Sequence, residues 1–185
     1  MSIFGRIFGG SGSNNPDRGT DTNQQLIRMQ QNIREEFVQE LRSEVENDEN
    51  FESQINKASS LRDIDQLIRT YEDRHQRMED QHGNIESKTS ILENKLREAE
   101  NQGLQTQAVV AARTNVQVLE NTEGETEEEL TEIDEALKDL DQAVKSGGIE
   151  LDSAKGRLDQ ILEKEENFIT KVETQMEHEW MDQYS

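Results

Sequence analysis

The sequence contains no cysteine and a single proline, and only 4% of its residues are aromatic. The absence of cysteine excludes disulfide bonds and thiolate chemistry. With 30% hydrophobic residues, the 185-residue chain lacks the apolar material for a thick globular core, and its 11 glycines give few turn signals. These shortages favour an all-α fold built from a small number of long helices.

Long hydrophobic runs are also missing. No stretch approaches the ~18 consecutive apolar residues that mark a membrane-spanning helix. The apolar residues near the start are interrupted by Gly5, Arg6 and Gly9 and do not form the core of a secretory signal. We therefore expect a cytoplasmic protein.

Basic residues are scarce relative to acidic ones. The chain has 20 Lys and Arg against 41 Asp and Glu, which gives a formal net charge of −21. Such a charge repels nucleic acids, so we expect no nucleic-acid partner. Because the acidic residues are spread along the chain, the pattern favours a halophilic protein from a high-salt cytoplasm, in which charge repulsion is screened. An ordinary acidic coiled coil is the alternative.

The first periodic segment predicts a helix from Thr22 to about Lys57. Thr22 and Gln25 have the spacing of a capping box, in which the first and fourth residues of a helix satisfy each other's backbone amides. One face of this helix carries an apolar stripe at Leu26, Ile33, Phe37, Leu41, Val45, Phe51 and Ile55.

A second capping box at Ser60 and Asp63 opens a longer heptad pattern. Continued past Gly103, this second arm would run over 61–119, and the short connection before Ser60 would let the first helix pack antiparallel to it. We predict a long antiparallel helical hairpin, a coiled coil, over 22–119, whose seam makes assembly contacts with another copy. The seam residues are Ile64, Ile68, Tyr71, His75, Met78, His82, Ile85, Leu92 and Leu96.

The rest of the chain predicts an acidic loop and two shorter amphipathic helices. Residues 120–125 are expected to form the loop, and Thr126 and Glu129 a further capping box. The first of the two helices would end before Gly147, and the second would carry a stripe from Leu151 to Trp180. The expected division is therefore an amphipathic element (1–12), a flexible linker (13–21), the hairpin (22–119) and the C-terminal helices (120–185).

Few residues suggest chemistry. His75 and His82 are seven positions apart with Glu79 between them, a spacing compatible with a metal site. Both occupy heptad positions, where polar residues commonly set register, and we favour that interpretation. No nucleophile, base and orienting group can be assembled, so we expect no enzyme, no metal and no cofactor.

The first eight residues contain Ile3, Phe4, Ile7 and Phe8. On a helix these four side chains form one apolar face, with Arg6 off that face. A Gly, Ser and Asn tract follows and separates them from the first long helix. The pattern favours insertion of the four apolar side chains into a membrane surface, with Arg6 contacting lipid headgroups. Packing of the segment into a groove of the protein itself is the alternative.

Two stretches resemble known families. MSIFGRIFGG resembles the N-terminus of Snf7-type ESCRT-III proteins, a short amphipathic segment that inserts into membranes. ILENKLREAENQGLQTQAVVAARTNV resembles the second hairpin arm of the phage-shock-protein-A family, in which a Leu-Glu-x-Lys-Leu run is followed by an Arg and small residues. Both families belong to one superfamily. The resemblance implies a homo-oligomer that polymerises into rods, rings or spirals and coats or remodels membranes. It does not decide whether an ATPase disassembles the polymer.

From these observations we expect a cytoplasmic, peripherally membrane-associated structural protein that polymerises. A second interpretation is an acidic coiled-coil scaffolding or adaptor protein with no membrane activity. Binding to liposomes distinguishes the two.

Overall fold

The computed structural model describes residues 16–182, with side chains from residue 19 onward. It contains four helices: α1 (Pro16–Lys57), α2 (Leu61–Asn101), α3 (Gln107–Lys145) and α4 (Leu151–Glu179). No strand occurs in the described range, so the predicted all-α class is confirmed.

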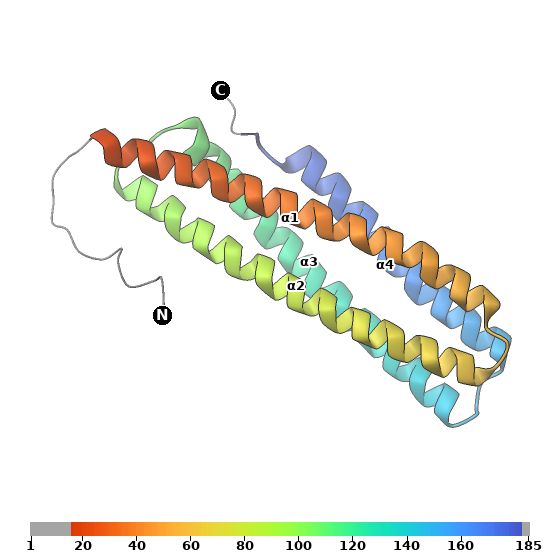
Figure 1. Ribbon diagram of the computed structural model, residues 1–185. Helices are drawn as coiled ribbons and strands as arrows, with labels where there is room; N and C mark the ends of the chain where they lie inside the picture. The colour runs from red at the N-terminus through yellow and green to blue at the C-terminus, as the bar shows by residue number, and fades with distance from the viewer. Residues whose placement is uncertain (1–15, 183–185) are drawn as a thin grey trace, which may run out of the picture.

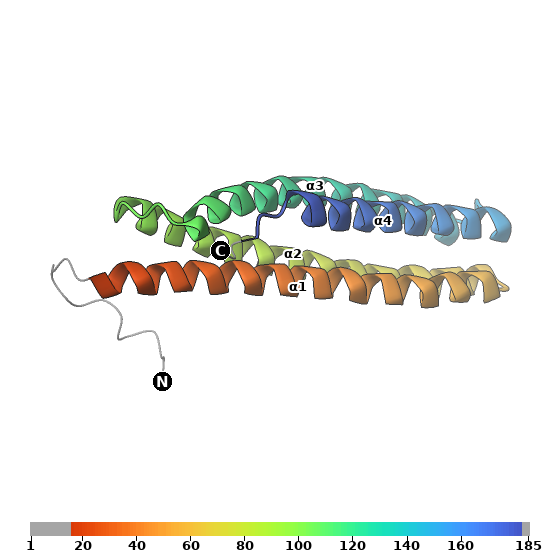
Figure 2. The same cartoon turned by 90° about the horizontal axis from the view of Figure 1, so that it is seen from above.

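The helices form an elongated antiparallel four-helix bundle (Figure 1). Seen from above, α1 and α2 lie in one layer and α3 and α4 in the other (Figure 2). Each helix packs along its neighbours in chain order, and α4 also packs on α1 and closes the ring. At ~1.5 Å per residue, the longest helix, α1, spans about 63 Å. α4 is the shortest helix and ends well before the beginning of α1 (Figure 1).

Short connections with defined caps separate the helices. Before α2, the Ser60 hydroxyl accepts a hydrogen bond from the Asp63 amide (3.3 Å), and the Asp63 carboxylate accepts one from the Ser60 amide (3.1 Å). This reciprocal pair confirms the predicted capping box at Ser60 and Asp63. The turns after α2 and α3 contain Gly103 (φ +72°) and Gly147 (φ +67°), a left-handed conformation that glycine adopts at little cost.

Apolar side chains fill the bundle in two clusters, one toward each end. The cluster at the α1–α2 and α3–α4 turns includes Phe51, Ile55, Ile64, Ile68, Tyr71, Leu137, Leu140, Leu158 and Leu162. The cluster toward the α2–α3 turn includes Leu26, Ile33, Leu92, Leu96, Val109, Ala112, Leu119, Val172, Met176 and Trp180. Every helix contributes one apolar face. The four apolar faces are buried against one another within a single chain.

Several predicted boundaries are wrong. α1 begins at Pro16, so Thr22 is inside the helix and is not a cap. α2 ends at Asn101 and does not continue to residue 119, because the chain turns at Gly103 and Thr106 caps a new helix. Residues 120–125 are helical within α3, and the Thr126 hydroxyl donates to the Thr122 carbonyl (2.7 Å), as in a helix interior.

The division into a long hairpin and two shorter helices is not confirmed. α3 has 39 residues, close to the 41 of α2 and the 42 of α1, and it packs against α2 along the bundle. Helical residues 16–21 also occupy the last part of the expected linker. The described helices are comparable elements of one bundle.

Candidate functional site

The predicted seam residues lie on the inner face of α2. Ile64, Ile68, Tyr71, His75, Ile85, Leu92 and Leu96 are buried, and Met78 and His82 are half-buried. Five of them belong to the apolar clusters shared with the other helices, and Met78, His82 and Ile85 border a small cavity among the four helices. In this conformation the seven buried seam residues are therefore unavailable to a second copy.

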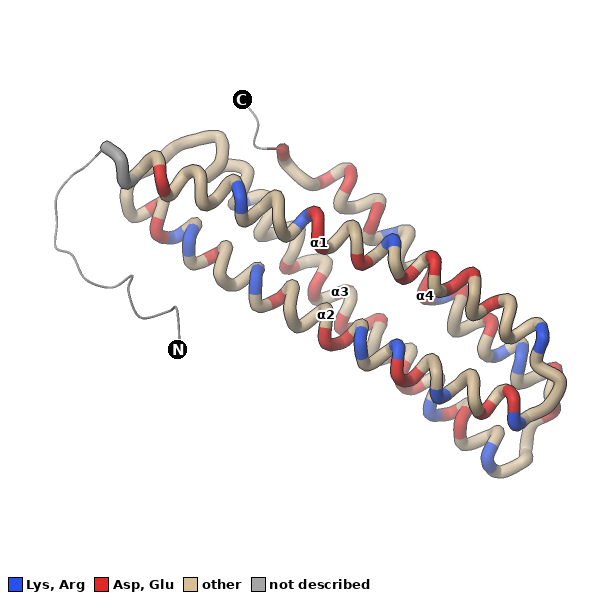
Figure 3. Tube along the Cα trace, in the orientation of Figure 1, with Lys and Arg blue, Asp and Glu red and all other residues tan. Residues whose placement is uncertain are grey.

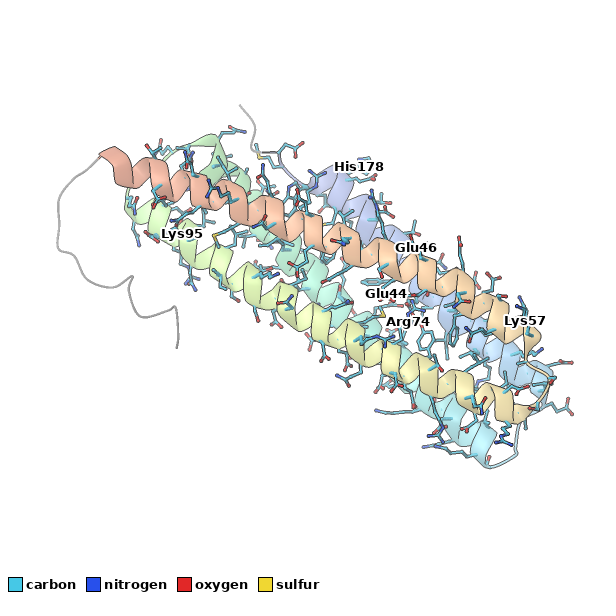
Figure 4. All side chains as sticks on the ribbon, viewed as in Figure 1. Glu44, Glu46, Lys57, Arg74, Lys95 and His178 are labelled. Atoms are coloured by element: carbon cyan, nitrogen blue, oxygen red, sulfur yellow. The ribbon has the colours of Figure 1, made fainter. Side chains whose placement is uncertain are left out.

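A buried charged cluster separates the two apolar clusters. It consists of Arg74 on α2, Glu44 and Asp48 on α1, and Glu165 on α4. Arg74 Nε donates to Glu44 Oε2 (2.6 Å), and Arg74 Nη2 donates to both Asp48 and Glu165. Figure 4 shows Glu44 and Arg74 approaching each other between α1 and α2. The cluster therefore joins three helices at the middle of the bundle.

Burial and repulsion raise the pKa values of two of these carboxyl groups. Desolvation is the main cause for Glu165, whose pKa rises to about 9, with the charges of Asp48 and Glu44 adding to the shift. Desolvation also raises the pKa of Asp48 to about 6, although Arg74 opposes this shift. Glu165 is therefore protonated at neutral pH, which reduces the excess negative charge around a single guanidinium group.

The aromatic ring of Tyr71 borders the same cluster. The Arg74 guanidinium carbon lies 5.5 Å from the Tyr71 ring centroid, and Phe51 packs edge-on against that ring at 5.1 Å. One oxygen of Asp48, one of Glu165 and Arg74 Nη1 have no hydrogen-bond partner. The only cation of the cluster is already paired and is closed in by these side chains, which leaves little room for a substrate.

Sequence reasoning missed the charged cluster. It assigned Val45 to the apolar stripe of the first helix, but Val45 is 42% exposed, and Glu44 and Asp48 face inward instead. The polar stretch between Leu41 and Phe51 was the available signal, because an interrupted stripe inside a continuous helix requires polar residues at inward positions. Their partner, Arg74, is not recognisable from spacing alone.

The candidate histidine metal site is not formed. His75 is buried, and its Nε2 lies 3.4 Å from Glu79 Oε1, while neither ring nitrogen makes a hydrogen bond. His82 instead borders a small cavity of about 70 Å³ among all four helices, together with Phe37, Met78 and Leu130. No group of three His, Cys, Asp or Glu residues within 16–182 is arranged to hold a metal ion.

A larger groove lies on the surface between α1 and the end of α4. We name it the α1–α4 groove. It has a volume of about 540 Å³. It is lined by Gln31, Arg34, Glu35, Val38, Gln39, Arg42, Glu173, Met176, Glu177, Trp180 and Asp182.

Polar contacts fix the end of the chain that forms one wall of this groove. The Asn115 side chain on α3 accepts a hydrogen bond from the Met181 amide (2.8 Å) and donates to the Met181 carbonyl (3.0 Å). Asn115 also donates to the buried Gln30 on α1 (2.7 Å), and Arg34 pairs with Asp182 (2.9 Å). The groove is thus preformed, because both of its walls are tied to the bundle.

Acidic residues occur along all four helices (Figure 3), and many of them are exposed. In the described part of the chain, the large apolar side chains that remain exposed are Val45, Ile91 and Val110. None of the described helices has the length and apolarity required to cross a bilayer. The predicted membrane-binding residues Ile3, Phe4, Arg6, Ile7 and Phe8 lie outside the described residues.

Comparisons with protein-family models, curated proteins and solved structures found no match.

Proposed function

We propose that this protein is a self-assembling structural protein that attaches to the cytoplasmic surface of a membrane through residues 1–12. The four-helix bundle remains outside the lipid. Ile3, Phe4, Ile7 and Phe8 insert between headgroups, and Arg6 contacts lipid phosphate. In this proposal copies of the bundle assemble into a polymer that coats or remodels the membrane.

One contrast within the chain carries the proposal. The four helices use their apolar faces in the bundle, and the large apolar side chains exposed within 16–182 are three separated residues on an acidic surface. The first eight residues, in contrast, concentrate four large apolar side chains beside a single positive charge. Because an acidic bundle repels anionic lipid, this segment is the part of the chain suited to contact a membrane.

Polymerisation is supported by the resemblance of residues 1–10 to Snf7-type ESCRT-III proteins. Residues 91–116, which resemble a hairpin arm of the phage-shock-protein-A family, contain the turn between α2 and α3 in this fold and add less support. A single copy of the segment gives marginal membrane affinity, whereas linked copies bind cooperatively because each later insertion is effectively intramolecular. Seven of the nine seam residues are buried in the bundle. They can therefore contact another copy only if the helices separate, and contacts between closed bundles would use the outer surfaces.

Liposome cosedimentation of the full chain, with negative-stain microscopy of the bound fraction, tests this proposal. We expect binding and polymers for the natural sequence. Phe4→Asp with Phe8→Asp should abolish binding, because inserting two carboxylates into the apolar layer costs several kcal/mol.

The matched control is Asn14→Asp with Asn15→Asp. It adds the same two charges within the polar tract, outside the apolar positions, and should retain binding. A natural chain that stays in the supernatant at every lipid concentration, as a small soluble oligomer, would contradict the membrane proposal and favour a scaffolding protein.

A further inference from the structure

We propose that the α1–α4 groove binds residues 3–8 of the same chain when no membrane is present. The groove and the membrane then compete for one set of apolar side chains. This inference rests on the proposed function, since it identifies what regulates the membrane-binding segment.

The length of the chain before α1 allows this contact. From Pro16, where α1 begins, to Gln31, at the near end of the groove, the helix rises about 22 Å. The eight residue steps from Phe8 to Pro16 reach up to about 27 Å when extended. The groove then continues about 16 Å along α1 to Arg42, and residues 3–8 need about 8 Å as a helix. The segment can therefore fold back along α1 and lie within the groove.

The chemistry of the groove matches the segment. Val38 is half-buried in its lining, and the largely buried side chains of Met176 and Trp180, which are 2% and 9% exposed, line it beside Val38. A volume of about 540 Å³ lies within the range of about 300–1,000 Å³ that ligand pockets occupy. Two phenylalanine and two isoleucine side chains are suitable occupants of such a surface, because burial removes their apolar area from water.

Charge supports the same occupant. Arg6 is the only charged side chain in residues 1–12. The groove carries the carboxylates of Glu35, Glu173 and Glu177 and one further guanidinium group, that of Arg42, and none of the four makes an ion pair within the described part of the chain, so carboxylates remain in excess. Its walls therefore offer acceptors for one guanidinium group. Asp182 is already held by Arg34 on the rim.

Trp180 provides a direct measurement, because it is the only tryptophan in the sequence. We expect acrylamide to quench its fluorescence more strongly in the full-length Phe4→Asp, Phe8→Asp variant than in the natural chain, both without lipid. The Asn14→Asp, Asn15→Asp control should quench like the natural chain. Equal quenching in all three proteins would overturn the groove proposal, whatever the liposome result.

A second variant changes the lining of the groove instead of residues 3–8. Val38→Glu places a carboxylate at a half-buried groove position, and Val45→Glu makes the same change at an exposed position on the same helix outside the groove. Val38→Glu should raise quenching of Trp180 and strengthen liposome binding. The gain is about tenfold if the segment is docked nine-tenths of the time, because the competing state is removed. Val45→Glu should change neither property.

These results separate the two proposals. Unchanged liposome binding in Val38→Glu, with a natural chain that does bind, would overturn the groove proposal and leave the membrane proposal standing. Increased quenching in both the segment variant and Val38→Glu, with no liposome binding by any form, would support the groove and contradict the membrane function.

Discussion

Arg74 is the residue on which the middle of the bundle depends. Its guanidinium group donates hydrogen bonds to the carboxyl groups of Glu44, Asp48 and Glu165 from two other helices, and all four residues are buried. Buried ion pairs contribute little net stability, because desolvation offsets the attraction between the charges. They do penalise wrong arrangements, since any shift of register would leave a charge unpaired in an apolar core. We infer that the cluster sets the relative positions of α1, α2 and α4.

The protonation of Glu165 gives a prediction about pH. Its pKa is about 9 in the folded chain against an ordinary 4.5, so between these values the folded state keeps a proton that the unfolded state loses. Stability should therefore fall as pH rises from about 4.5 to about 9. The raised pKa of Asp48, about 6, adds to the same trend below that pH.

Glu165→Gln mimics the protonated form of the side chain. The free energy of unfolding of this variant, measured by urea denaturation from pH 5 to 9, should therefore fall less with rising pH than that of the natural chain. At the alkaline end, the variant should be more stable than the natural chain by on the order of a few kcal/mol. Glu163→Gln, at an exposed position on the same helix, should keep the natural slope. A variant whose stability declines as steeply as that of the natural chain would show that Glu165 is already ionised at neutral pH.

At the scale of elements, the presence of long helices could be predicted from the sequence, but some of the residues at which they begin and end could not. The end of α1 near Lys57, the capping box at Ser60 and the start of α4 at Leu151 all follow local signals that the structure confirms. The acidic segment NTEGET predicts a loop after Leu119, but this stretch is helical in the structure. It is helical because Glu is a good helix former. The buried side chain of Thr122 also continues the inward-facing side of the helix between Leu119 and Leu130.

The charged cluster shows where prediction from the sequence stops. Which polar residues of α1 face inward depends on Arg74 and Glu165, which lie 30 and 121 residues beyond Glu44 in the chain. An amphipathic stripe reports one helix at a time, whereas the partner of a buried charge is set by how helices pack. For the same reason the heptad seam of α2 indicated burial but did not indicate whether the partner was this chain or another copy.

The cap of α2 gives a prediction at the same scale. Ser60→Ala removes the hydroxyl that accepts from the Asp63 amide, and should cost about 1 kcal/mol of unfolding free energy. Ser90→Ala is the matched control, since it makes the same change at an exposed position inside α2. Chemical denaturation followed by circular dichroism measures both. A loss at Ser90 equal to that at Ser60 would mean that the cap does not stabilise the turn.

At the scale of the whole molecule, the net charge of −21 dominates. Acidic residues outnumber basic ones along every helix (Figure 3), and many of them are exposed. Most ion pairs are partly exposed pairs of the kind that contribute at most about 1 kcal/mol each. The bundle therefore folds against its own surface repulsion, and its stability depends on how strongly the solvent screens that repulsion.

Salt should consequently stabilise the bundle. Between about 10 mM and about 1 M KCl the Debye length falls from about 30 Å to about 3 Å, which confines repulsion to immediate neighbours. We expect the thermal midpoint to rise steeply over this range. A variant with Glu127, Glu128 and Glu135 changed to Gln removes three exposed acidic charges and should need less salt to reach the same midpoint. KCl also acts on the hydration of apolar groups, and the variant leaves this contribution almost unchanged. If the thermal midpoints of the natural chain and the variant rise in parallel with KCl, the salt effect comes from the apolar core and not from surface charge. A midpoint independent of KCl would remove the argument for adaptation to high salt.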